Sequence, residues 1–175
     1  MRPAAAGRYE KRDSMKFDLG EHFIDAARTV LNSVHCATGE APETGRGRKG
    51  GIVSGEVLVI APLRGDAEGD LVLNMNTPTA LRIIGKMALL YGIALTPYGL
   101  ESLAELANII IGNAMNGLRI KGIRLTTLPP FVVTPGHLPA STAHVEAWRA
   151  PLVTECGLVT VHILVAVRCM IEEEP

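Results

Sequence analysis

A long alternating segment near the end of the chain constrains the fold more than any other feature of the sequence. From Leu158 to Met170, every second residue is β-branched as far as Val167. The β-branched residues are Val159, Val161, Ile163, Val165 and Val167, and the residues between them are Leu158, Thr160, His162, Leu164, Ala166 and Arg168. A period of two places the β-branched side chains on one face of a strand, and that face must be buried. The rest of the chain therefore has to supply partner strands and a covering layer.

Shorter strand segments precede this one. Ile52–Ala61 and Asp70–Met75 flank the turn residues Leu63-Arg64-Gly65-Asp66, which predicts a hairpin. Further strands are expected at 123–128, 131–134 and 145–153. Because Pro151 has no N–H to donate, it should end the last of these strands or place it at an edge of the sheet.

Three segments have apolar residues at helical spacing, at 17–36, 77–92 and 97–118. The second and third open with Thr77-Pro78 and Thr96-Pro97, a pattern typical of an N-cap followed by proline at the first helical position. Gly117 is expected as the C-cap of the third. Since the helices are grouped between strand pairs, the sequence predicts an α+β fold. We expect a two-layer sandwich of an antiparallel or mixed sheet with two long helices plus an N-terminal helix.

Length and composition predict one globular unit. The chain has 175 residues with 47% hydrophobic content, enough for a single core. We expect a disordered N-terminal extension over residues 1–14, followed by a single domain over 15–172. The stretch 37–51 contains GRGRKGG and is expected to be a solvated loop, because its spacing is not that of a phosphate-binding Walker loop.

Charge and hydropathy exclude several classes of protein. The formal net charge of -1 gives no field that would draw the chain toward nucleic acid or anionic lipid. The N-terminal residues include no apolar segment typical of a signal peptide, and no apolar run approaches the roughly 18 residues that a spanning helix needs. We therefore expect a cytoplasmic protein with neither nucleic-acid nor membrane partners.

Cysteine and histidine usage argues against a metal or disulfide-based fold. The three cysteines (Cys36, Cys156 and Cys169) are an odd number without CxxC spacing, so we expect inert thiols in a reducing cytosol. His162 lies in the long strand and Trp148 is the single Trp, and both are expected to be packing or interface residues. No second ligand lies at a usable spacing, so no metal site is predicted.

The third helix has an unusual polar face. At about 100° per residue, Leu103, Leu106, Ala107, Ile110 and Ala114 share the side that must pack on the sheet. The opposite side presents Glu101, Glu105, Asn108, Gly112 and Asn116. A solvated surface is the ordinary interpretation of such a face. However, Asn and Gly are poor helix formers, and no Lys or Arg follows the glutamates to pair with them. Gly112 would instead let a partner approach closely.

Glu105 and Asn108 suit phosphoryl chemistry. Residues three apart on a helix project side by side, so the pair offers a carboxylate anchor and a carboxamide. An amide can orient a water for in-line attack on a phosphoryl group, because positioning does most of the work in phosphoryl transfer. An ExxN pair by itself occurs by chance in many helices.

The segments ELANIIIGNAMNGL (105–118) and LPPFVVTPG (128–136) resemble the CheX-like branch of the CheC, CheX and FliY chemotaxis phosphatases. That family has Glu-x-x-Asn followed closely by Gly. After about twenty residues comes a proline that opens a P-x-x-V-x-x-G-like strand and turn, for which Pro129 or Pro130 with Gly136 fits. Weaker similarity extends from about Phe17 to the end of the chain. The family often has Asp or Ser four residues before the Glu, where this chain has Glu101, a departure that bears on substrate preference and rate more than on fold.

The resemblance implies a phosphatase that removes the aspartyl phosphate of a CheY-like response regulator. Glu105 would pair with a lysine of the regulator, and Asn108 would position the attacking water, with Glu101 and Gly112 contacting the partner. The regulator would supply the Mg²⁺, so no cofactor of the chain's own is implied. The single ExxN helix favours the one-site CheX type, whose members commonly form homodimers.

Two other functions remain open from the sequence. The same helix could dock a receiver domain without catalysis, with Glu105 and Asn108 only shaping the interface. Alternatively, the chain could be a dimerisation domain that uses its long final strand, with the polar face simply solvated. The identity of the regulator and the pathway depend on surface contacts outside these residues.

Overall fold

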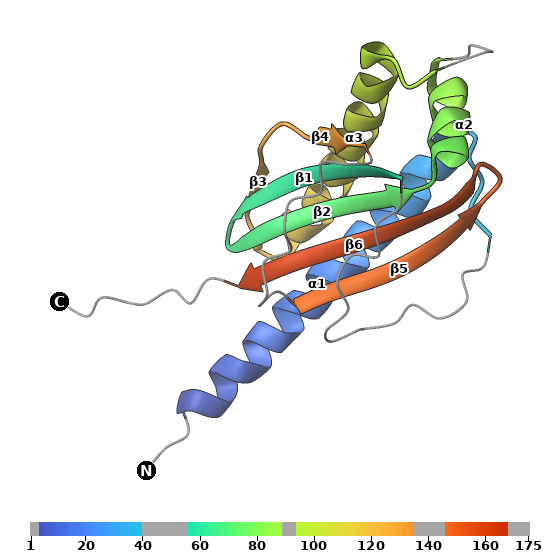
Figure 1. Cartoon of the computed structure of the whole chain (residues 1–175). Helices are drawn as coiled ribbons and strands as arrows, with labels where there is room; N and C mark the ends of the chain where they lie inside the picture. The colour runs from blue at the N-terminus through green and yellow to red at the C-terminus, as the bar shows by residue number, and fades with distance from the viewer. Residues whose placement is uncertain (1–3, 40–55, 89–93, 135–145, 168–175) are drawn as a thin grey trace.

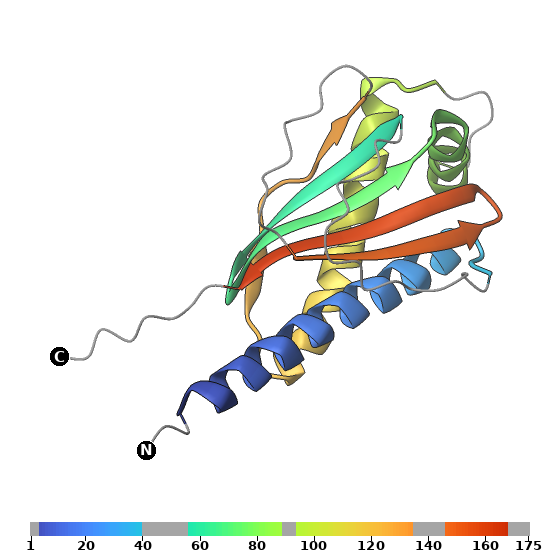
Figure 2. The ribbon, with the colours of Figure 1, turned by 60° about the horizontal axis from the view of Figure 1, so that its bottom comes forward.

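The computed structural model describes residues 4–39, 56–88, 94–134 and 146–167, and in these ranges the chain forms a layer of three helices against one face of an antiparallel sheet (Figures 1 and 2). The strand order is β3-β1-β2-β6-β5, and β4 also pairs with β1. The strands are β1 (Val57–Gly65), β2 (Ala67–Met75), β3 (Leu125–Thr127), β4 (Phe131–Val133), β5 (Glu146–Thr154) and β6 (Gly157–Val167). The predicted α+β sandwich is confirmed, with every strand pair antiparallel.

The strand predictions are largely confirmed, with one shift at the first hairpin. β1 continues to Gly65 and β2 begins at Ala67, so most of the expected turn belongs to the strands and the connection is tight. Residues 52–55 and the expected loops at 40–51 and 137–143 lie outside the described part of the chain. β5 contains Pro151 and is an edge strand, as a proline inside a strand requires.

The helices are α1 (Ala4–Ser33), α2 (Thr77–Ala88) and α3 (Pro97–Ile120). α1 begins well before Phe17, so the expectation that residues 1–14 are disordered is wrong for residues 4–14. That stretch is rich in Ala, Arg, Lys and Glu, which favour helix. The placement of a single domain over 15–172 stays a prediction.

The helix ends differ from expectation in two places. Asn76 caps α2, since its Oδ1 accepts a hydrogen bond from the Thr79 N–H at 2.9 Å, and Thr77 is already helical. α3 continues past Gly117 to Ile120, with Lys121 at the C-cap. Gly117 instead lies against α1, where an added Cβ would come within 3.3 Å of the His22 ring. A close approach of the two helices, and not chain termination, therefore explains this glycine.

The core lies between the helix layer and the sheet. Every second residue of the central strands faces the helices, and these side chains pack against the inner faces of α1 and α3. Gly20 of α1 lies so close to Trp148 of β5 that a Cβ would sit 2.6 Å from the indole ring. α1 can therefore cross the edge strand closely only because this position is glycine.

The other face of the sheet is also buried at its centre. Leu58, Ile60 and Val72 form a second cluster there, and Thr160 and His162 of β6 are 6% and 2% exposed. The expectation that His162 is a packing residue agrees with this burial. The face of β6 that carries Thr160 and His162 is therefore buried at these positions and not exposed to solvent.

A disulfide joins Cys36 to Cys156, and the expectation of inert free thiols is wrong for this pair. Both residues are buried, and their Cα atoms lie 5.7 Å apart, within the usual range for a disulfide. The chain after α1 runs along the end of the β5–β6 hairpin, where the Glu155 N–H donates to the Ala37 carbonyl at 3.0 Å. This pairing brings together two cysteines that are 120 residues apart in sequence. Cys169 lies outside the described residues.

Candidate active site

α3 is fixed at its start and along one face. Thr96 caps the helix, its Oγ1 accepting a hydrogen bond from the Gly99 N–H at 3.2 Å, and Pro97 follows. The predicted cap is thus confirmed. The inner face is buried against the sheet and α1 through Leu103, Leu106, Ala107, Ile110, Ala114 and Leu118. Because these residues fix the rotation of the helix, they determine which side chains point outward.

Glu105 and Asn108 lie side by side on the outer face of α3. Glu105 is exposed and Asn108 is half-buried. The Asn108 Nδ2 donates to the Glu105 Oε2 at 3.4 Å, a long and therefore weak hydrogen bond. The carboxylate keeps most of its acceptor capacity, and the Asn108 carbonyl oxygen remains an acceptor. The structure thus places a carboxylate and a carboxamide next to each other at the surface.

Glu101 and Gly112 extend this face by one turn in each direction. Both are exposed, and a Cβ built on Gly112 meets no atom within 4 Å. The fold therefore does not require glycine at position 112, although alanine would favour the helix by roughly 1 kcal/mol. Asn113, beside it, turns its Nδ2 to the Ile109 carbonyl at 2.9 Å.

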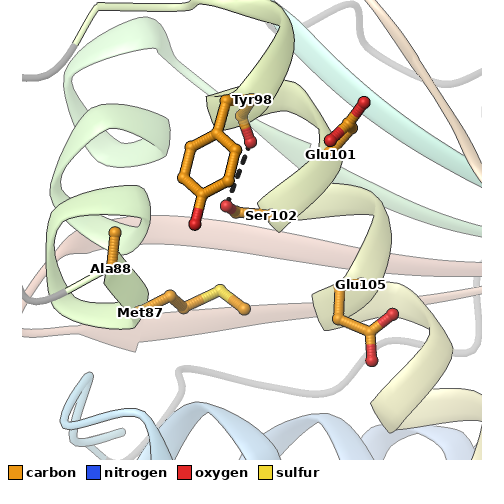
Figure 3. A pocket seen from close by; sticks show the side chains of 6 residues that line it. All are labelled: Met87, Ala88, Tyr98, Glu101, Ser102 and Glu105. Carbon is orange, nitrogen blue, oxygen red and sulfur yellow. Dashed lines mark hydrogen bonds between the residues drawn. The ribbon is translucent and has the colours of Figure 1, made fainter.

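An open hollow between α2 and α3 adjoins the pair, and no local sequence pattern predicts it. Its volume is about 250 Å³, and it is lined by Met87, Ala88, Tyr98, Glu101, Ser102 and Glu105. Figure 3 shows the Met87 side chain extending from α2, the carboxylates of Glu101 and Glu105 on α3, and the Tyr98 ring, which comes from the start of α3, between the two helices. The Ser102 Oγ donates to the Tyr98 carbonyl at 3.1 Å.

Two exposed apolar side chains flank Glu105 on the same helix. Tyr98 is 66% exposed and Ile109 is 37% exposed. At about 100° per residue, both lie within roughly 40° of Glu105 on the helix surface. Apolar and aromatic side chains at the surface around a polar pair are typical of a docking site.

Other sequence candidates do not join this site. Pro129 and Pro130 precede β4, and Gly136 lies outside the described residues. Among residues 4–39, 56–88, 94–134 and 146–167, no three His, Cys, Asp or Glu side chains come together in a way that could hold a metal ion. No described helix combines the length and the hydropathy that crossing a membrane requires.

The ionisable groups with clear pKa shifts lie away from the pair. Burial, together with the positive charge of Arg149, lowers the pKa of His162 to about 4. Burial raises the pKa of Asp70, an effect that Arg64 partly offsets. The Thr77 N–H donates to the Glu56 carboxylate at 2.8 Å and lowers its pKa. These shifts belong to the sheet and to the start of α2.

Family and structural comparisons agree with one another. Residues 57–151 match the family described as "Chemotaxis phosphatase CheX", which covers α2, α3 and the β1–β2 hairpin. No curated protein sequence matches the chain.

Several solved structures share the fold. A CheC-like superfamily protein from Shewanella sp. PV-4 has a TM-score of 0.72 at 21% identity, covering 85% of this chain and 97% of that one. A chemotaxis protein CheX from Desulfovibrio desulfuricans has a TM-score of 0.71 at 18% identity, covering 85% and 99%. The CheX-CheY-BeF3-Mg complex from Borrelia burgdorferi has a TM-score of 0.66 at 25% identity, covering 83% and 96%.

Proposed function

Since the chain belongs to the CheX family of chemotaxis phosphatases, we propose that it removes the phosphoryl group from the aspartyl phosphate of a CheY-like response regulator. The observation that carries this proposal is the Glu105–Asn108 pair on the outer face of α3, joined by a hydrogen bond of 3.4 Å on a helix whose other face is buried. A pair on a rigid helix can enter a partner's active site with little loss of conformational entropy.

The two residues take different roles in the proposal. Glu105 anchors the regulator by pairing with a lysine beside the phosphorylated aspartate. Asn108 accepts a hydrogen bond from a water and directs its oxygen toward phosphorus, in line with the acyl oxygen. Water attacks phosphorus, the bond to the aspartate oxygen breaks, and the products are inorganic phosphate and the free aspartate carboxylate. The proton lost by the water passes to phosphate or to solvent.

The regulator supplies the phosphoaspartate and the Mg²⁺ in this scheme. The magnesium neutralises charge that develops on the phosphoryl oxygens. This chain then needs to add only position and hydrogen bonding, which suits a site made of one carboxylate and one amide. The Borrelia CheX in complex with CheY, BeF3 and Mg²⁺ supports a partner of this class.

Oligomeric state and location belong to the same proposal. We infer a homodimer that forms through the sheet, and a cytoplasmic location with the regulator. Val153 and Leu158, cross-strand partners at one end of β5 and β6, are 46% and 50% exposed, and they offer apolar surface for such a contact. Sedimentation at several concentrations tests the dimer.

A non-catalytic docking module is the rival function. The exposed apolar residues Tyr98 and Ile109 would serve it equally well. The two functions differ in what Glu105 and Asn108 do once a complex has formed. A docking module would bind the phosphorylated regulator without changing its lifetime.

The experiment is the decay rate of phosphorylated receiver domains from the same genome, measured with increasing amounts of the chain. The proposal expects faster decay of at least one receiver, saturating with concentration. Glu105→Gln should shift the half-saturating concentration upward, because the charged anchor is lost. If no receiver decays faster with the unmodified chain, the catalytic function is wrong and a docking or dimerisation module remains.

A further inference from the structure

The hollow beside Glu105 combines an aromatic ring, a thioether and two carboxylates. Met87 of α2 and the Tyr98 ring, which extends from the start of α3, provide apolar surface, and Glu101 and Glu105 of α3 provide negative charge (Figure 3). Tyr98, at 66% exposed, costs the free protein unfavourable apolar contact with water. Its ring presents a negative π face that attracts cations.

The two carboxylates are not neutralised within the described part of the chain. Glu101 and Glu105 stand four residues apart, so like charges face each other on adjacent turns at a cost of roughly 0.2 to 0.5 kcal/mol. Among the described residues, neither Glu101 nor Glu105 forms a salt bridge, whereas Asp25 on α1 pairs with Arg28 at 3.6 Å. A cation from outside would relieve this repulsion.

We propose that this hollow is a specificity subsite, formed by Glu101, Tyr98 and Met87, for a second basic side chain of the response regulator, a lysine or an arginine. The inference rests on the proposed function, in which Glu105 already pairs with the lysine at the phosphorylation site. Glu101, one turn closer to the start of α3, is left to pair with another cation. The aliphatic stem of that side chain lies across Met87, and its charged group lies between the Tyr98 ring and the Glu101 carboxylate.

Charge favours this occupant over an apolar side chain. A leucine or phenylalanine in the hollow would partly desolvate Glu101 and Glu105 without compensating them. A lysine or arginine buries its methylene groups on the same apolar surface and pairs with a carboxylate as well. The subsite therefore selects regulators that carry a basic residue beside the phosphorylation site.

The test measures receiver decay against concentration of the chain for the unmodified protein and for Glu101→Gln. We expect the half-saturating concentration to rise roughly tenfold, which corresponds to one charge pair at about 1.4 kcal/mol, with the rate at saturation unchanged. The difference should shrink at high salt, because added ions screen an exposed pair. Glu21→Gln, which removes an exposed carboxylate from α1, should leave both quantities unchanged.

Two further variants separate charge from packing. Tyr98→Ala should raise the half-saturating concentration, whereas Tyr98→Phe should not, since the ring is retained. Glu101→Lys should bind the regulator poorly, and changing one regulator lysine or arginine to glutamate should restore its binding.

The outcomes separate the subsite from the proposed function. If the unmodified chain speeds decay but Glu101→Gln has the same half-saturating concentration, the subsite is wrong and the phosphatase stands. If no basic residue of the regulator restores binding to Glu101→Lys, the occupant is wrong. If the unmodified chain speeds no decay, the proposed function fails, and the subsite fails with it.

Discussion

The two faces of α3 differ in what they require of the sequence. The inner face is fully buried and carries Leu103, Leu106 and Ile110, each with 0% exposure. The outer face, only one or two residues away in sequence, carries Glu105, Asn108 and Gly112, which make few contacts with the rest of the fold. Substitutions on the inner face should therefore cost stability, and those on the outer face should cost activity.

This difference explains why the site can be a short motif on a large fold. The buried residues that position the helix are not the site residues. The site residues can therefore be chosen for contact with a partner without loss of core packing.

The largest expected effect is on stability when the disulfide is reduced. The Cys36–Cys156 bond closes a loop of 120 residues, and the chain-entropy account gives about 4 to 5 kcal/mol for a loop of this size. Thermal unfolding with and without dithiothreitol measures this loss of stability, and Cys36→Ser serves as the reference without the disulfide. Receiver decay at 25 °C should be unaffected while the protein stays folded. A loss of activity in the folded, reduced protein would show that the outer face of α3 depends on this distant part of the core.

Leu106→Ala should destabilise the fold by about 3 kcal/mol, because it leaves a cavity between α3 and the core. Urea unfolding measures the loss. The folded fraction should still speed receiver decay at the unmodified rate, and Leu128→Ala, at a site that is 49% exposed, is the matched control. If the folded fraction of Leu106→Ala has a lower saturated rate than the unmodified chain, core packing and chemistry cannot be separated.

Acid should destabilise the sheet through His162. Its folded pKa is about 4 and its ordinary value is 6.5, so between these values the unfolded chain binds the proton more tightly. Stability is therefore complete above pH 6.5 and is lost as the pH falls toward 4, by up to about 3 kcal/mol. Unfolding measured from pH 7 to 4 tests this. His162→Gln should flatten the profile, and an unchanged slope in that variant would assign the effect to another group.

Gly112→Ala should have the smallest effect on stability and the opposite sign. The added methyl meets no atom within 4 Å, so the helix should gain up to about 1 kcal/mol. In the proposed function, the methyl obstructs the regulator, and the half-saturating concentration should rise. A variant that is both more stable and equally active would show that nothing approaches the helix at this position.

Local patterns predicted much of this architecture. The Thr96 cap, the edge position of the strand with Pro151 and the burial of the β-branched residues of β6 all follow from residue type and spacing. The outer face of α3 was predictable for the same reason, since about half a helical turn separates its residues from the core face.

Features that depend on distant segments could not be predicted. The disulfide needs the end of α1 to meet the β5–β6 turn. The hollow lined by Met87 and Tyr98 exists only because α2 and α3 meet at a particular angle and distance. Asn76 displaced Thr77 as the cap of α2 because either side chain can serve, and local spacing does not choose between them.

The most direct test of the central claim is the saturated decay rate of the phosphorylated receiver with Asn108→Ala, measured together with receiver binding and thermal unfolding. Loss of one positioning group should lower the accelerated rate by about 100-fold, while binding and unfolding stay near those of the unmodified chain. A variant that keeps the full rate at saturation would contradict the account, because Asn108 would then have no part in hydrolysis.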